Sequence, residues 1–251
     1  MSLLALFLLL GCSAAPTIDG KVVDIWGEPI EGATVLIEGA GERPMTDNEG
    51  RYSFSYVAGP QKLKAGKDGY IQAHMETSFA EGDTEGPTFE LYQMPAENGF
   101  YLVGPNSYTK LGQQTVETIG TGFDPLRGIK KLGDAKTDRP ALNVVFHTEL
   151  KHEEILRLGL ELHKLTFVKE RELAGPLGNQ QVDVNLYTAE KKVEIEITPM
   201  RSPTDYLVTT KGDLEPGSYA FQTQNLLDME DQEAFDRIPA QMRSVFPFEY
   251  K

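Results

Sequence analysis

The sequence predicts an all-β protein built from two domains. Apolar and polar residues alternate over short stretches, which places every second side chain on a buried face of a strand. The chain has 24 glycines and 15 prolines, the residues that form tight turns between short strands. We expect one domain over residues 17–95 and a second, mainly-β domain with one short C-terminal helix over residues 96–251, after a separate segment of residues 1–16.

The first residues have the features of a bacterial export signal. An apolar run from Leu3 to Leu10 is shorter than the ~20 residues that cross a bilayer as a helix, and small residues follow it. Leu9-Leu10-Gly11-Cys12 resembles the lipobox of bacterial lipoproteins. The resemblance implies cleavage before Cys12, a diacylglycerol on its thiol and a further acyl chain, such as palmitate, on the freed amine. Cys12 is the only cysteine, so lipidation explains a thiol that cannot form an intramolecular disulfide.

Two alternatives for this segment stay open. An ordinary signal peptide could be cut near Ala14-Ala15 and discard Cys12, or the apolar run could be a buried N-terminal strand. No Lys or Arg precedes the run, so the natural start can lie upstream. We favour lipidation, which predicts a cell-envelope protein anchored to the membrane by two or more acyl chains. Ser13 rather than Asp follows Cys12, which favours the outer membrane in a diderm organism.

The charge balance excludes some functions. The chain has 38 acidic and 24 basic residues and a net charge of −14. A surface of this sign repels nucleic acid and anionic headgroups, so no nucleic-acid partner is expected. No second long apolar run follows residues 1–16, and we expect no transmembrane helix. The content of aliphatic and aromatic residues is too high for a disordered chain.

Alternation and turns define the first domain. Residues 33–38 and 52–57 alternate between the two faces of a strand, and Phe89 and Leu91 repeat the pattern. Turn sequences separate these stretches, since Gly allows positive φ and Pro presets a turn. The turn sequences are Trp26-Gly27-Glu28-Pro29, Asp47-Asn48-Glu49-Gly50, Gly59-Pro60 and Lys67-Asp68-Gly69.

Four sequence blocks in this region share a known pattern. They are residues 20–24 (Gly-Lys-Val-Val-Asp), 27–35 (Gly-Glu-Pro-Ile-Glu-Gly-Ala-Thr-Val), 46–54 (Thr-Asp-Asn-Glu-Gly-Arg-Tyr-Ser-Phe) and 65–70 (Ala-Gly-Lys-Asp-Gly-Tyr). In this order they resemble the carboxypeptidase regulatory-like domain. The resemblance implies a transthyretin-like (prealbumin-like) seven-stranded β-sandwich with an accessory role, and it implies no catalysis.

The residues of these blocks are expected to be structural. The glycines shape the backbone, and the carboxylate of Asp47 is expected to accept hydrogen bonds from turn amides. Two functional alternatives are weaker. A Ca²⁺ site at residues 47–49 would have too few ligands. Trp26, a candidate platform for stacking a sugar, more often covers the end of a sandwich.

Strand patterns continue in the second region, for which we find no family resemblance. Leucines alternate with other residues from Leu156 to Leu162 and predict a strand. The parity then shifts to Leu165, which predicts a bulge near His163-Lys164. The other predicted strands cover residues 100–103, 142–146, 182–187, 193–197, 206–208 and 219–221.

The C-terminal part contains the one predicted helix. Asp228 is expected to cap it, acidic residues follow in its first turns, and it should end before Pro239. Residues 246–250 are expected to dock as an edge strand.

Residues 120–140 are Gly-rich, have no clear period and contain several basic residues. These cations form a local positive region in an acidic protein, suited to an anionic partner. The plain alternative is a surface loop, since long loops in compact domains are either functional or disordered. The candidate binding residues are Arg127, Lys130, Lys131, Lys136 and Arg139, set against Asp124, Asp134 and Asp138.

No catalytic, cofactor or metal site is predicted. None of the 4 histidines has the spacing to Glu of a metallocarboxypeptidase. No His-Glu-x-x-His, Gly-x-Ser-x-Gly, phosphate-loop or dinucleotide-binding sequence occurs. A metal site at His147, His152, Glu153 and Glu154 is the alternative to exposed strand-end side chains.

The sequence therefore predicts a membrane-anchored envelope lipoprotein with non-catalytic β-domains that bind or position something. Its partner would be a glycan, another envelope protein or an assembly component, and the first domain could serve as a spacer. The alternative is an envelope hydrolase or another enzyme with an unrecognised site in the second domain.

Overall fold

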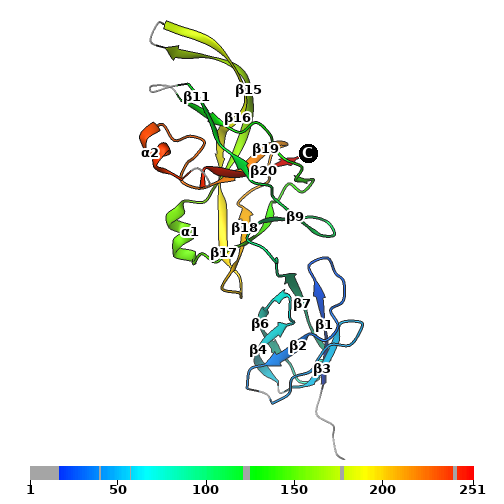
Figure 1. Cartoon of the computed structure of the whole chain (residues 1–251). Coiled ribbons are helices and arrows are strands. Elements are labelled where there is room, and N and C mark those ends of the chain that lie inside the picture. The colour runs from blue at the N-terminus through cyan, green and yellow to red at the C-terminus, as the bar shows by residue number, and fades with distance from the viewer. Residues whose placement is uncertain (1–16, 40, 57, 121–124, 176–177, 240–241) are drawn as a thin grey trace, which may run out of the picture. The chain divides into compact units, whose positions relative to one another are not determined.

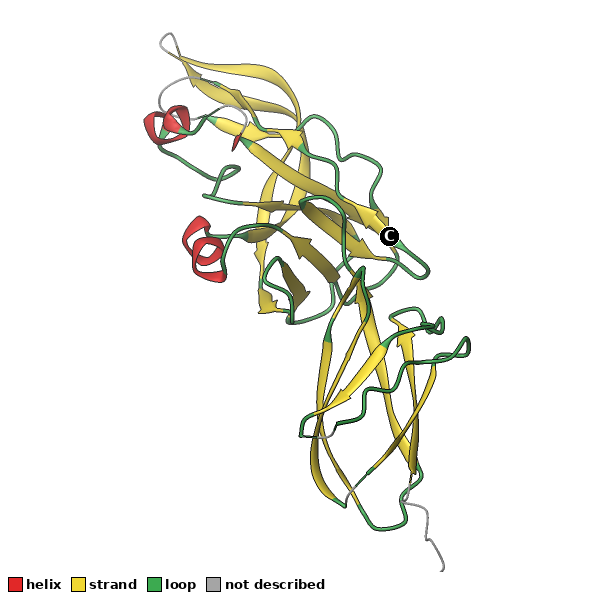
Figure 2. Cartoon of the chain, turned by 60° about the horizontal axis from the view of Figure 1, so that its bottom comes forward, coloured by secondary structure: helices red, strands yellow, loops and turns green. Residues whose placement is uncertain are grey.

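The computed structural model describes residues 17–251 except 40, 57, 121–124, 176–177 and 240–241 (Figure 1). Cys12 and the predicted export segment therefore lie outside the described residues. The chain divides into two compact units, with the boundary between Gln93 and Met94. Strands dominate both units, and the predicted all-β class is confirmed (Figure 2).

Unit 1 is a β-sandwich of two sheets. A four-stranded sheet has the order β3-β1-β7-β5 and a three-stranded sheet the order β2-β4-β6. β1 pairs with β3 in antiparallel and with β7 in parallel orientation. The strands are β1 (Thr17–Asp24), β2 (Thr34–Ile37), β3 (Arg51–Ser55), β4 (Gly59–Gly66), β5 (Tyr70–Ile71), β6 (Ala73–Phe79) and β7 (Glu85–Gln93).

The core of unit 1 lies between these sheets. Burial alternates along the strands as the sequence pattern predicts, so that Tyr52 and Phe54 of β3 are buried while their neighbours are not. The Tyr52 hydroxyl donates to the carbonyl of Pro87 at 2.7 Å, and burial raises the pKa of this phenol. The core residues are Ile18, Val22, Ile30, Ala33, Val35, Ile37, Tyr52, Phe54, Tyr56, Leu63, Ala65, Phe79, Phe89 and Leu91.

The turn before β3 shows why its residues are needed. Asp47 Oδ1 accepts the backbone N–H groups of Glu49 at 2.9 Å and Arg51 at 2.8 Å, which confirms Asp47 as the turn acceptor. Gly50 has φ of 71°, a conformation that costs side-chain-bearing residues energy. A Cβ at Gly50 would also lie 2.5 Å from the carbonyl oxygen of Val22. Only glycine fits here.

Unit 2 contains three sheets. The largest has six strands, with the path β10-β20-β19-β15-β16 and β13 added beside β20. A five-stranded sheet has the order β17-β18-β14-β8-β9, and β11 and β12 form a separate hairpin. The strands before the first helix are β8 (Gly99–Val103), β9 (Tyr108–Lys110), β10 (Gln114–Thr115), β11 (Glu117–Ile119), β12 (Leu126–Gly128), β13 (Lys136–Thr137) and β14 (Asn143–His147). The later elements are α1 (His152–Leu158), β15 (Glu161–Gly175), β16 (Gly178–Val193), β17 (Ile195–Pro199), β18 (Asp205–Thr210), β19 (Gly217–Gln222), α2 (Gln232–Arg237) and β20 (Ser244–Tyr250).

The six-stranded sheet is buried on both faces. Tyr219 and Phe221 of β19 join Phe100 and Val144 of the five-stranded sheet in one core. Ala220, between them on β19, belongs to a second core with Phe235 of α2. The helix α2 and the segments around β11–β12 therefore cover the face of this sheet that the five-stranded sheet leaves open.

β15 and β16 form a hairpin that extends beyond the sheet (Figure 1). β19 pairs with β15 only from Glu161 to Leu165, whereas β15 and β16 remain paired out to their far ends. The register shifts between Lys164 and Leu165, next to the predicted bulge. Farther out, Glu170 stands directly opposite Asp183 in this two-stranded ribbon.

The predicted strand over Leu156–Leu162 is wrong in its first half, which is helix α1. The carbonyl of Lys151 accepts the backbone N–H groups of Glu154 and Ile155 at the start of the helix. In return, the carboxylate of Glu154 accepts the N–H of Lys151 at 2.8 Å. Gly159 ends the helix in the left-handed conformation. Only Ile155 of this helix is buried, so the alternating leucines do not mark a buried face, and Leu favours helix.

Three further expectations, for the helix cap, the number of helices and the last strand, are wrong. Asp231, not Asp228, caps α2, because its side chain accepts the N–H of Ala234 at 3.0 Å. The described residues thus contain two helices rather than one, although α2 does end before Pro239. β20 is not an edge strand, since it lies between β19 on one side and β10 and β13 on the other.

Replacement of Gly50 should destabilise unit 1 more than replacement of Gly27, which has φ of 89° but no atom within 4 Å of an added Cβ. We expect Gly27→Ala to lower the free energy of unfolding by about 1–2 kcal/mol through backbone strain. Gly50→Ala should add a clash of about 1–3 kcal/mol. Urea unfolding followed by Trp26 fluorescence checks this, because the only tryptophan lies in unit 1. Equal losses in the two variants would contradict the steric argument.

Candidate functional site

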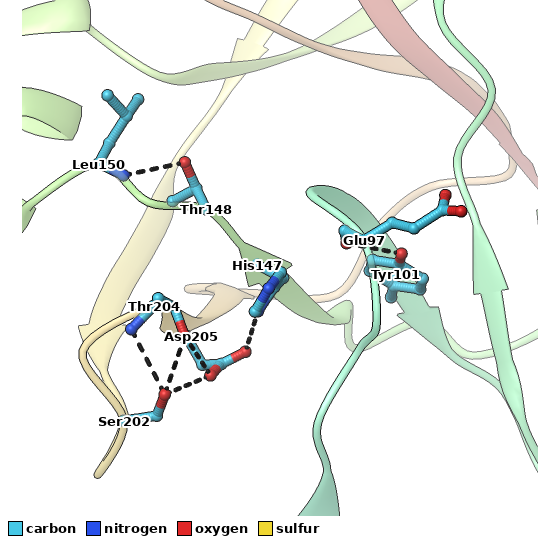
Figure 3. A network of polar contacts seen from close by, with 8 residues as sticks. All are labelled: Glu97, Tyr101, His147, Thr148, Leu150, Ser202, Thr204 and Asp205. Atoms are coloured by element: carbon cyan, nitrogen blue, oxygen red, sulfur yellow. Dashed lines mark hydrogen bonds and ion pairs between the residues drawn. The ribbon is translucent and has the colours of Figure 1, made fainter. Parts of the chain in front are cut away.

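A polar network surrounds Asp205 at the start of β18 (Figure 3). The side chain of Asp205 is fully buried, and its Oδ1 lies 2.8 Å from Nδ1 of His147 on β14. Its Oδ2 accepts the hydroxyl of Ser202 at 2.5 Å and that of Thr204 at 3.1 Å. The register of β14 and β18 pairs His147 with Asp205 directly, so sheet geometry creates this cluster.

The order of groups in the network is not that of a hydrolase. In a catalytic triad the imidazole lies between the nucleophile and the carboxylate, so that it can take the hydroxyl proton. Here the carboxylate of Asp205 lies in the middle and binds both His147 and Ser202. The Ser202 hydroxyl therefore donates to a buried acceptor. The network joins the end of β14 to the turn before β18, which is a structural role.

The four residues weighed as a metal site have separate contacts. His147 binds Asp205, whereas the ring of His152 stacks on Tyr206 at 5.9 Å between centroids. Glu154 is used in the N-terminal cap of α1. Within the described ranges, no group of three or more His, Cys, Asp or Glu is placed to hold a metal ion.

His163 belongs to a second buried cluster, at the base of the β15–β16 hairpin. Its Nε2 lies 3.1 Å from Oε2 of Glu161, and Lys192 of β16 also donates to Glu161. Burial alone would raise the pKa of Glu161, but hydrogen bonds from Lys192 and His163 outweigh it and lower the pKa. The cluster ties the two hairpin strands together.

The predicted basic stretch borders a cleft of about 570 Å³, here called the Lys131 cleft. It is formed by the segment after β12 together with side chains from β10, β16 and β20. Its lining is polar except for a leucine and an aromatic ring. The lining residues are Gln114, Lys130, Lys131, Leu132, Gly133, Asp134, Tyr187 and Glu249.

Charges around the Lys131 cleft are largely balanced. Lys130 pairs with Glu117 at 2.7 Å, and Glu249 pairs with Lys136 at 3.0 Å. The bond to Glu249 raises the pKa of Lys136. Lys131 is exposed, and within the described part of the chain no ion pair of its ammonium occurs. The cleft thus offers one free cation among hydrogen-bonding groups.

Tyr187, which lines this cleft, belongs to an aromatic pair. Tyr187 of β16 lies opposite Phe167 of β15, with ring centroids 5.0 Å apart. Phe167 is 51% exposed, so one ring of this pair faces solvent. Flat apolar rings beside hydrogen-bonding groups suit a ligand that has both apolar faces and polar edges.

The structure does not bring the five predicted basic residues together. Arg127 is 2% exposed, so its interpretation as a surface cation is wrong. Its Nη2 donates to Gln232 at 2.7 Å, Nη1 donates to the carbonyl of Met229, and the guanidinium lies 4.4 Å from the ring centroid of Phe235. Burial lowers the pKa of Arg127, although Asp236 and Asp231 oppose this shift. Arg139 is exposed outside the cleft.

Sequence patterns missed the other residues of the cleft. Gln114, Tyr187 and Glu249 come from strands far apart along the chain. The pairing of β10 and β13 with β20 brings Gln114 and Glu249 to the cleft, and a bridge between Ile129 and Tyr187 brings Tyr187. The stretch 120–140, expected to lack periodic structure, contains β12 and β13. For Tyr187 the sequence offers one indication of a binding role, which is an aromatic side chain in a predicted strand.

The comparisons with known proteins define the class of unit 1. Residues 17–92 match the carboxypeptidase regulatory-like domain, and they coincide with the sandwich described above. The predicted resemblance is confirmed for this part of the chain. The search of curated proteins gives no match to the chain.

Solved structures show only distant similarity. A chain of a type II cohesin–X-dockerin complex from Acetivibrio cellulolyticus is 20% identical with a TM-score of 0.29 over 32% of this chain, which spans 58% of the length of that chain. A candidate carbohydrate-binding protein from Bacteroides uniformis is 11% identical with a TM-score of 0.25, covering 83% of this chain and 87% of its own. A DUF3823 family protein from Parabacteroides merdae is 11% identical with a TM-score of 0.24, covering 84% and 92%. Similarity of this strength assigns no function.

Removal of Asp205 should reduce stability. We expect Asp205→Ala to lower the free energy of unfolding by about 2–4 kcal/mol, because His147, Ser202 and Thr204 would lose a buried acceptor. The exposed Asp213 provides the control, and Asp213→Ala should change stability by less than about 0.5 kcal/mol. Calorimetric melting of the two variants measures the difference. A variant Asp205→Ala as stable as wild type would refute the structural role.

Proposed function

We propose that this chain is a non-catalytic binding protein of the bacterial cell envelope, held to a membrane by acyl chains on Cys12. Unit 2 provides the binding surface, and unit 1 is an accessory domain that links this surface to the anchor. The ligand is a glycan or another polar polymer of the envelope.

The Lys131 cleft carries the proposal. It combines the exposed ammonium of Lys131, the carboxylates of Asp134 and Glu249 and the amide of Gln114 with the ring of Tyr187. Sugars present hydroxyl groups at their edges and C–H groups on their faces. The hydroxyl groups can exchange hydrogen bonds with Gln114, Asp134 and Lys131, while the C–H faces can pack on an aromatic ring. The volume of about 570 Å³ falls within the range of small-ligand sites.

The anchor is supported by the sequence Leu9-Leu10-Gly11-Cys12, which lies outside the described residues. No helix in the described part of the chain is long and apolar enough to span a bilayer. Acyl chains contribute ~0.8 kcal/mol per buried methylene, so two or more hold a protein stably. By the identity of Ser13, the outer membrane is the favoured site in a diderm organism.

A hydrolase is the competing function. The cluster of His147, Asp205 and Ser202 places the carboxylate of Asp205 between the other two groups, and this order supports a structural role. The proposal of a binding protein is therefore preferred to that of an enzyme.

The anchor is tested by substitution of Cys12. Wild-type protein should incorporate radiolabelled palmitate and sediment with membranes, whereas Cys12→Ala should do neither, because the thiol is the attachment point. Ser13→Ala serves as a matched control and should still be labelled. Unlabelled wild-type protein in the cytosol with residues 1–16 intact would overturn the envelope assignment.

The cleft is tested with a glycan array and an envelope pull-down. Tyr187→Ala and the double charge reversal Lys130→Glu/Lys131→Glu should weaken capture of the ligand by about tenfold or more, since each removes about 1–2 kcal/mol of contact. Arg139→Glu is the control, because Arg139 belongs to the same basic stretch but lies outside the cleft lining. Unchanged partners in all variants would exclude the cleft as the binding surface.

A further inference from the structure

Three lysines lie in or beside the Lys131 cleft, and carboxylates of the protein bind two of them. The ammonium of Lys130 lies 2.7 Å from Glu117, and that of Lys136 lies 3.0 Å from Glu249. The bond to Glu249 raises the pKa of Lys136, and the charge of Asp134 adds to this shift. The acidic side chains around the cleft therefore act on Lys130 and Lys136.

Lys131 differs from these two lysines. It is exposed, and within the described ranges its ammonium has neither a hydrogen bond nor an ion pair. A ligand that covers this ammonium removes its water, which is costly unless the ligand supplies a partner. A negatively charged group compensates best, because charge-assisted hydrogen bonds are roughly twice as strong as neutral ones.

The segment that carries Lys131 is fixed at both of its ends. Ile129 is fully buried and exchanges two backbone hydrogen bonds with Tyr187, at 3.0 and 2.8 Å. At the other end, the carbonyl of Ala135 accepts the N–H of Glu249 at 3.0 Å. Lys131 thus follows closely on the point where the chain is fastened to Tyr187, and both residues line the cleft. A backbone held before binding lowers the entropy cost of capturing a ligand.

The charge of the whole chain limits how many negative groups a ligand can carry. The net charge is −14, although salt screens exposed charges beyond about 8 Å under physiological conditions. A single anionic group inside the cleft is therefore attracted by Lys131 more strongly than distant carboxylates repel it. A polymer with a negative group on every unit would also meet the acidic surface outside the cleft and be repelled there.

We propose that the Lys131 cleft binds a glycan through a sugar unit that carries a single carboxylate, as a uronic acid does. The carboxylate contacts the ammonium of Lys131, the face of the sugar ring packs on Tyr187, and a hydroxyl group bonds to the amide of Gln114. This selection rests on the glycan function proposed for the cleft and adds the class of sugar.

A glycan array of matched pairs tests the selection with the full-length protein. Each pair consists of an oligosaccharide with one uronic acid unit and its carboxyl-reduced form, in which a hydroxymethyl group replaces the carboxylate. At least one acidic member should be captured about tenfold more strongly than its reduced form, and added salt should narrow this difference.

The outcomes of the array separate the two proposals for the cleft. Equal capture of both members of every pair would overturn the selection of an acidic sugar and leave the glycan function standing. Capture of neither member would overturn both. Stronger capture of oligosaccharides that carry an acid on every unit would contradict the limit to a single carboxylate.

Substitutions at exposed positions locate the contact. Lys131→Gln should remove the preference for the acidic member without weakening capture of the reduced form, because only the acidic member has a charge to pair. Lys131→Arg keeps the charge and should keep the preference. Arg139→Gln is the matched control, since Arg139 is exposed in the same basic stretch but lies outside the cleft lining. A preference that survives Lys131→Gln, or that Arg139→Gln also removes, would overturn the role of Lys131.

Discussion

The six-stranded sheet of unit 2 must bury both of its faces, and the rest of that unit is arranged around this constraint. Strand β19 sends Tyr219 and Phe221 into the core shared with the five-stranded sheet, and it sends Ala220 toward α2. A strand covered on both sides is apolar at successive positions rather than at alternate ones. The second face needs a cover, which α2 and the β11–β12 region provide. The Lys131 cleft forms where this cover meets the sheet.

Local patterns were sufficient for unit 1. A period of two, glycines at positive φ and an aspartate that accepts turn amides are all decided within a few residues, and Tyr52, Gly50 and Asp47 behave as expected. The same approach was wrong at Leu156–Leu162, where residues three to four apart decide the outcome. The cap between Lys151 and Glu154 and the helix end at Gly159 overrode an alternation of leucines that coincided with the strand period.

The candidate site could be predicted only in part, and the reason is long-range packing. Lys130 and Lys131 line the cleft as their charge indicated, but Arg127 lies in the interior because Phe235 and Gln232, from a distant part of the chain, close over it. Nothing in the residues next to Arg127 distinguishes it from a surface cation. Likewise, Tyr187 and Glu249 reach the cleft through strand pairing, which a count of basic residues does not reveal.

The ribbon formed by the outer halves of β15 and β16 has a consequence for association between copies of the protein. Two-stranded ribbons expose backbone groups along their edges, and these groups invite a strand from another copy. Glu170 faces Asp183 across this ribbon, and Glu172 follows on the same strand. Lys169 and Arg171 alternate with these acidic residues along β15, so this edge of the ribbon carries charged side chains. Charged side chains along an edge disfavour its pairing with a strand of another copy.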